Sequence, residues 1–146
     1  IALGYAQLKA GTAVQEVTYK AVNLGASYDF GFVKPMLLIA TERGASRGVN
    51  AYTLGASAPV GLSGELRIGY TRFDARNQVD ADSSKLGFGY IHKLSKRTEI
   101  YGLFARVNND SNAARGFAVS SSSLASPLIA AGDSATGYSI GMRHSF

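Results

Sequence analysis

Apolar and polar residues alternate with a period of two along most of the chain, in segments of about ten residues. Between Ala21 and Phe30, small or polar residues separate the members of one apolar row, which are Val22, Leu24, Ala26, Tyr28 and Phe30. The three-four spacing of an amphipathic helix is weak everywhere. The pattern therefore predicts β-strands with one apolar face and one small or polar face.

The same alternation recurs in four further segments. Their apolar rows are Tyr52, Leu54, Ala56 and Ala58; Leu66, Ile68 and Tyr70; Leu86, Phe88 and Tyr90; and Tyr138, Ile140, Met142, His144 and Phe146. A crude internal repeat places a glycine on the opposite face, at Gly25, Gly55, Gly87 and Gly141. We use this glycine phase to assign faces in the segments where alternation alone is ambiguous.

The glycine phase predicts that Leu3 and Tyr5 are apolar-face residues of an opening strand from Ile1 to Leu8. In the segment from Ile100 to Val107 it puts Gly102, Phe104 and Arg106 on the polar face, and on the apolar face it puts Tyr101, Leu103, Ala105 and Val107. The segment from Val33 to Thr41 stays open, because Pro35 argues against a regular hydrogen-bond ladder there.

Connectors of two kinds separate these segments. Short ones rich in turn residues span Asp29–Val33, Pro59–Gly64 and Leu94–Thr98. Longer ones span Arg43–Gly48, Asp74–Ser83 and Asn108–Ala135, and we expect the Ser120–Ser123 tract to be a surface loop, not a domain linker. The sequence therefore predicts about eight antiparallel strands within one segment, residues 1–146.

The face opposite the apolar row is too rich in Gly, Ala, Ser and Thr for the exterior of a soluble sheet. Aromatic residues near the strand ends are typical of the interfacial girdles of outer-membrane barrels, and the girdle candidates are Tyr28, Phe30, Tyr70, Tyr90, Tyr101 and Tyr138. Nine to eleven tilted residues also match the apolar height of such a barrel. We therefore predict an all-β, antiparallel transmembrane β-barrel, with a soluble lipocalin-like barrel or sandwich as the alternative.

Three motifs resemble the C-terminal half of general porins from β-proteobacteria: the ending Gly141–Phe146, the strand Ala26–Gly31, and the turn Leu94–Thr98 leading into Glu99-Ile100-Tyr101. The resemblance implies a sixteen-stranded, homotrimeric barrel with a water-filled lumen for small solutes, and several porins of this group favour anions. It also implies a terminal signal for the barrel-assembly machinery, here Tyr138, Ile140, Met142, His144 and Phe146.

Eight strands are half of that number, and nothing in the sequence corresponds to the inward-folded constriction loop of the N-terminal half. The first residues, from Ile1 onward, show neither the basic segment nor the long apolar segment that is typical of a cleavable signal. We expect the chain to be part of a longer one. The alternative is an autonomous eight-stranded barrel, whose interior should be filled by side chains, whereas glycines recur on the inner face here.

The chain carries 15 Lys and Arg against 10 Asp and Glu, a formal net charge of +5. In a barrel, the alternation predicts these pore-lining residues: Glu65, Arg67, Lys85, Arg106 and Arg143. A basic lining enriches anions in the lumen. The alternative is that each of these residues pairs with an opposite charge on a neighbouring strand. Connector arginines are expected to be solvated or to bind lipopolysaccharide phosphates: Arg43, Arg47, Arg76 and Arg115.

The sequence offers no support for an enzyme. It has no Cys, no HExxH motif and no phosphate-loop motif, and only two histidines, His92 and His144, both in the phase of the apolar row. Four loop aspartates, Asp74, Asp80, Asp82 and Asp110, are too irregularly spaced for a calcium loop. Because alternation separates aromatic from basic residues, nucleic-acid binding is not expected. We predict no catalytic residue, metal or cofactor.

The predicted function is passive diffusion of small hydrophilic solutes and ions across the Gram-negative outer membrane, with a mild anion preference. The alternative is a structural or adhesive barrel without an open channel. Expected partners are outer-membrane lipid and lipopolysaccharide, two further copies of the chain in a homotrimer, and the barrel-assembly machinery during insertion.

Overall fold

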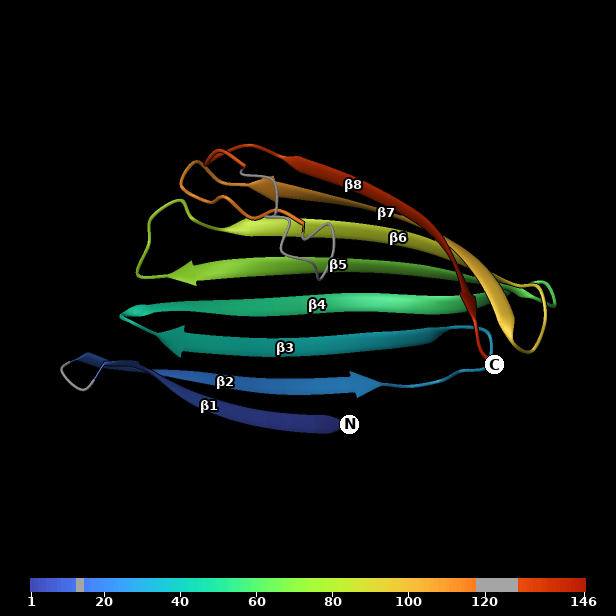
Figure 1. Cartoon of the computed structure of the whole chain (residues 1–146), viewed down its shortest axis with the longest axis horizontal. Coiled ribbons are helices and arrows are strands. Elements are labelled where there is room, and N and C mark those ends of the chain that lie inside the picture. Colours follow the sequence, from blue (N-terminus) through green and yellow to red (C-terminus); the bar gives the residue numbers. More distant parts are fainter. Residues whose placement is uncertain (13–14, 118–128) are drawn as a thin grey trace.

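The computed structural model describes residues 1–12, 15–117 and 129–146, which form one antiparallel sheet of eight strands in chain order (Figure 1). The strands are β1 (Ala2–Thr12), β2 (Gln15–Ser27), β3 (Lys34–Gly44), β4 (Arg47–Val60), β5 (Gly64–Arg76), β6 (Ser83–Lys93), β7 (Thr98–Asn109) and β8 (Ala135–His144). The prediction of eight antiparallel strands is confirmed. Within these ranges, no helix is long and apolar enough to cross a membrane.

The sheet is open. Each strand pairs with its neighbours in the chain, and β1 and β8 lie at opposite edges (Figure 1). In the part of the chain that the structure describes, β1 and β8 make no contact with each other. One ladder of backbone donors and acceptors therefore stays unpaired at each edge, and in lipid such edges require further strands to pair with them.

Connections alternate between the two ends of the sheet. The turns β2–β3, β4–β5 and β6–β7 lie at one end, which we call the short-turn end; the other connections lie at the opposite, long-loop end (Figure 1). One expectation was wrong: the Arg43–Gly48 connector is a tight turn, because Gly44 pairs with Arg47 and only Ala45 and Ser46 lie between the strands. The Ser120–Ser123 tract lies outside the described residues.

The ambiguous segment around Pro35 is a regular strand. Pro35 pairs with Ala56 of β4, while the ladder between β2 and β3 ends one residue further on, at Met36. The Pro35 carbonyl still accepts a hydrogen bond from the Tyr28 amide at 3.3 Å. Proline is tolerated because it occupies the second residue of the strand, where no β2 partner needs its missing amide.

Directly opposed residues of an antiparallel pair share a face, so the register assigns every strand residue to one of two faces. The apolar face carries five large side chains with exposed fractions of 46, 64, 54, 49 and 85%: Leu24, Leu54, Ile68, Phe88 and Ile140. Nothing in the described chain covers them. A sandwich or a soluble barrel would bury this row, so that alternative is wrong.

Burial is concentrated at the long-loop end. The buried apolar residues of the described chain are Ala81, Val107, Ala113 and Ala135, which come from strand ends and from the loops between them. None of these four is larger than valine, so the described residues form no buried layer of large apolar side chains on either face of the sheet. The fold therefore depends on its backbone ladders and on the medium that meets its two faces, not on a dry core.

Candidate functional site

The polar face is the candidate site, because it carries charged side chains between small residues. Arg67 lies opposite Gly89 and Ser57, Lys85 lies opposite Thr71, and Arg143 lies opposite Glu99. Glu65 is on the same face, two residues before Arg67. The register thus brings four of the five predicted lining residues to one face.

Arg106 is the exception, and the face predicted for β7 was wrong. The register places Arg106 opposite Leu86 and Phe104 opposite Phe88, so both belong to the apolar face. The glycine phase failed because Gly102 lies opposite Tyr90 on the apolar face, whereas the four glycines of the internal repeat lie on the polar face. A Cβ at Gly102 would meet no atom within 4 Å, so this glycine reflects no close approach.

Part of the charge on the polar face is neutralised by local ion pairs. Arg67 Nε lies 2.5 Å from Glu65 Oε1, and Arg143 Nη2 lies 2.7 Å from Glu99 Oε1. The alternative of pairing with a neighbouring strand therefore holds for Arg143, whereas Arg67 and Glu65 pair with each other within β5. Lys85 instead has its ammonium 5.8 Å from the centre of the Phe117 ring, a weak cation–π contact.

Two further lysines on this face were not predicted. Lys34 lies opposite Ser57, and Lys93 lies opposite Glu99. Lys93 continues the row of Lys85, Gly87 and Gly89, so a longer reading of the β6 alternation would have found it. Lys34 precedes Pro35 in the segment whose alternation was ambiguous, and no signal in the sequence assigned its face.

The segment after β7 lies on the polar face. The Arg115 guanidinium lies 4.3 Å from the centre of the Phe73 ring, and a Cβ at Gly137 would lie 3.3 Å from the Phe117 ring. Burial lowers the pKa of Arg115, while the charge of Glu42 opposes that shift. Arg115 and Phe117 therefore lie against the polar side of β5, β6 and β8 near the long-loop end.

Arg115 was expected to be solvated or bound to lipopolysaccharide, and the structure instead packs it against the sheet. Its amide donates to Asn109 Oδ1 at 3.1 Å, and Asn109 Nδ2 donates to the Arg115 carbonyl at 2.9 Å. Asn109 also donates to the Asp133 carbonyl at 2.7 Å. This asparagine fixes both ends of the β7–β8 loop.

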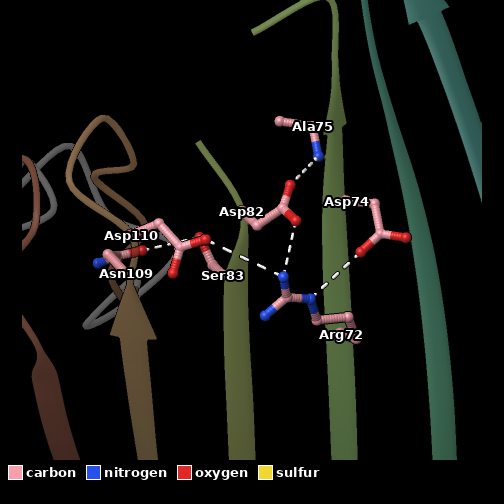
Figure 2. A network of polar contacts seen from close by, with 7 residues as sticks. All are labelled: Arg72, Asp74, Ala75, Asp82, Ser83, Asn109 and Asp110. Atoms are coloured by element: carbon pink, nitrogen blue, oxygen red, sulfur yellow. Dashed lines mark hydrogen bonds and ion pairs between the residues drawn. The ribbon is translucent and has the colours of Figure 1, made fainter. Parts of the chain in front are cut away.

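A second polar network joins the loops at the long-loop end (Figure 2). The Arg72 guanidinium donates to Asp82 Oδ2 at 2.7 Å and to Asp74 Oδ1 at 3.2 Å, and Asp110 Oδ2 lies 4.0 Å away. The Arg72 guanidinium thus lies between the carboxylates of Asp74, Asp82 and Asp110, where a bound cation would otherwise have to lie. Within the described ranges, no group of three or more acidic, His or Cys side chains is placed to hold a metal ion.

The predicted girdle residues separate into three groups. Tyr70, Tyr90 and Tyr138 are on the apolar face, and Tyr28 and Phe30 lie in the β2–β3 turn with ring centres 4.7 Å apart. Tyr101 lies opposite Ile91 and Gly141, on the polar face, so its predicted position was wrong.

Two aromatic residues that were absent from the girdle prediction, Tyr52 and Phe104, lie on the apolar face instead. The C-terminal row Tyr138, Ile140, Met142 and His144 keeps the predicted phase.

The two histidines lie on different strands near the short-turn end. His144 Nδ1 lies 2.9 Å from Thr98 Oγ1, and His92 Nδ1 lies 3.0 Å from the Tyr90 hydroxyl. Nδ1 of each histidine therefore has a hydroxyl partner. Among the described residues, no carboxylate forms an ion pair with either histidine, so the orienting acid of a Ser-His-Asp type triad is missing.

Comparisons with known proteins agree with this arrangement. Residues 1–112 match the family described as Gram-negative porin. The chain is 35% identical over 149 residues to outer membrane porin protein 32 of Delftia acidovorans, with 99% of this chain and 42% of that protein covered. It superposes with a TM-score of 0.84 on the structure of an anion-selective porin from Comamonas acidovorans, at 34% identity, covering 99% of this chain and 44% of that chain.

The chain therefore spans less than half the length of these relatives. The matches agree with the prediction of a non-enzymatic protein of the Gram-negative outer membrane. Three findings point to one family: the exposed apolar face, the packing of the segment after β7 on the polar face, and the family match over more than half of the residues. The chain belongs to the family of Gram-negative porins.

Proposed function

We propose that strands β1–β8, residues 1–146, form part of the wall of a water-filled pore through which small hydrophilic solutes and ions cross the outer membrane passively. One observation carries this proposal: a single sheet has an exposed apolar face and an opposite face that bears charges and its own loop. Lipid can cover the exposed apolar face, and water can solvate the charges of the opposite face.

A mild anion preference follows from the charges on the polar face. The lining residues we propose are Glu65, Arg67, Lys85 and Arg143, with Lys34 and Lys93 added. Ion pairs neutralise Arg67 and Arg143, so the free lysines supply the excess positive charge. The similar structure from Comamonas acidovorans is described as anion-selective, which supports the same preference here.

Closure of the barrel by further strands is part of the proposal, because the edges of β1 and β8 need partners in lipid. This argues against a closed eight-stranded structural or adhesive barrel, which would pair β1 with β8. We also propose that the pore is a homotrimer, contacts lipid and lipopolysaccharide, and is inserted by the barrel-assembly machinery. The aromatic girdle would then be Tyr28, Phe30, Tyr70, Tyr90 and Tyr138, and the assembly signal Tyr138, Ile140, Met142, His144 and Phe146.

The test is single-channel recording of the full-length protein in a planar lipid bilayer. We expect discrete conductance steps of a wide, water-filled pore. Under a KCl gradient, the sign of the reversal potential should correspond to a chloride permeability above that of potassium. A protein that inserts, shows heat-modifiable migration on gels and stays electrically silent would contradict the pore and support the structural barrel.

A further inference from the structure

A strongly basic groove lies at the short-turn end, on the polar side of β6–β8. It has a volume of about 380 Å³, and its wall includes Lys93, Lys96, Arg97, Glu99, Arg143 and Ser145. We call it the basic groove. Short turns of outer-membrane barrels face the periplasm, so the groove would open at the periplasmic mouth of the proposed pore.

The turn that carries two of these cations is held by hydrogen bonds. Ser95 Oγ accepts from the amides of Arg97 and Thr98, both at 3.1 Å, and the Leu94 amide donates to the Thr98 carbonyl at 2.9 Å. The Ser145 amide donates to the Arg97 carbonyl at 2.9 Å, which ties the turn to the segment after β8. The backbone of the groove is therefore fixed before any ligand arrives.

The charges of the groove do not cancel. Its single carboxylate, Glu99, is mostly buried, with 18% of its side chain exposed, and is already paired with Arg143 at 2.7 Å. Among residues 1–12, 15–117 and 129–146, the structure has no ion pair to Lys93, Lys96 or Arg97. Three cations are thus left without an acidic partner in one concave site.

A second groove at the same end of the sheet provides a contrast. It has a larger volume, about 520 Å³, and its charged residues are Asp29, Lys34, Glu65 and Arg67. Two acids balance two bases there, and Arg67 is paired with Glu65. The excess of positive charge is therefore a property of the β6–β8 side, not of the whole short-turn end.

We propose that the basic groove binds a compact multivalent oxyanion, a polyphosphate or polycarboxylate dissolved in the periplasm. Its position at a pore mouth rests on the proposed function, but the binding itself does not. Hydroxyl groups of Ser95 and Ser145 in the wall can donate to oxyanion oxygens next to the cations. A monovalent ion would leave two cations unbalanced, so the groove favours multiple charges.

The test is calorimetric titration of inorganic pyrophosphate into the full-length protein folded in detergent at low salt. Single-residue K93Q and K34Q variants form a matched pair, because both remove one exposed lysine of the polar face near the short-turn end. We expect K93Q to weaken binding about three-fold and the triple variant K93Q/K96Q/R97Q more than about ten-fold, whereas K34Q stays within about two-fold.

Equal affinity of the wild type and the triple variant, or equal losses in K93Q and K34Q, would overturn the proposal. If the triple variant does not fold, the comparison of K93Q with K34Q still tests the proposal. A second arm compares nanodiscs of neutral lipid with nanodiscs containing phosphatidylglycerol. We expect the same affinity in both, and loss of binding in the anionic nanodiscs would assign the groove to lipid phosphates instead. Failure of the pore itself would appear in the conductance recordings and would leave this titration unaffected.

Discussion

Arg72 and Asp82 join strand β5 to the end of the loop that follows it, with Nη2 of the arginine 2.7 Å from Oδ2 of the aspartate (Figure 2). The other carboxylate oxygen, Oδ1, accepts a hydrogen bond from the Ala75 amide at 2.8 Å. Asp82 thus closes the β5–β6 loop onto β5 with both oxygens. Asp74, in contrast, makes one longer contact with Arg72, at 3.2 Å.

We expect D82A to lower the free energy of unfolding by about 1–2 kcal/mol, because it removes a charge-assisted hydrogen bond and leaves a backbone donor unsatisfied. D74A is the control and should cost less than about 0.5 kcal/mol, since an exposed single contact contributes little. Urea unfolding in detergent measures both. Amide hydrogen exchange at Ala75 gives a local readout, and unchanged protection in D82A would contradict the assignment.

The β3–β4 turn stores backbone strain that one substitution should relieve. Ala45 and Ser46 both have positive φ angles, 49° and 61°, in a two-residue turn that favours Asn-Gly. We expect S46G to stabilise the protein by about 1 kcal/mol, because glycine adopts this conformation without the steric cost of a Cβ.

The matched control for this turn is Gly61, which has φ 62° in the β4–β5 turn and open space around the position of a Cβ. G61A should therefore cost about 1 kcal/mol through the backbone alone. Thermal unfolding of both variants, with the wild type alongside, measures the two shifts. Shifts of the same sign would show that the φ angles of these turns do not set their stability.

The number of strands and most faces could be predicted from the sequence because alternation has a physical cause: lipid requires an apolar row and water tolerates small or polar residues. The strand ends at the long-loop end could not, since β1 runs to Thr12 and β2 begins at Gln15. The prediction failed in β7, where Phe104 and Leu103 are both apolar and alternation loses its meaning. Only the register with β6, which sets Phe104 opposite Phe88, decides between the two phases. Such pairing across strands leaves no signal in a single strand's sequence.

The contacts of the loops could not be predicted either. Arg115 was expected to be solvated, yet its guanidinium lies 4.3 Å from the centre of the Phe73 ring. These residues are far apart in the sequence, and a loop's path depends on contacts such as Asn109 with Asp133, which periodicity does not encode. Composition gave the excess of positive charge, but the fold decides which cations are paired.

The corrected face of Arg106 predicts different effects on ion selectivity for two cations near the long-loop end. Lys85 is on the polar face and Arg106 is on the apolar face, hydrogen-bonded to Asn108 at 2.9 Å. K85Q should lower the ratio of anion to cation permeability of the full-length pore, by up to about two-fold, because it removes a charge from the lumen. R106Q should leave that ratio unchanged. Reversal potentials under a KCl gradient compare the two, and an effect of R106Q as large as that of K85Q would mean that Arg106 faces the lumen.

Adjacent residues of β8 test which face meets lipid. Ile140 lies opposite Gly102 on the apolar face with 85% of its surface exposed, and Ser139 lies opposite Leu103 on the polar face. I140R should destabilise the full-length barrel by about 2–4 kcal/mol, the cost of an arginine near the middle of the bilayer. S139R should be nearly neutral for stability, because its guanidinium reaches water. Unfolding by denaturant in lipid vesicles measures both variants, with the same substitution made at neighbouring positions of one strand. If S139R were the more destabilising of the two, the faces would be reversed and the apolar row would not contact lipid.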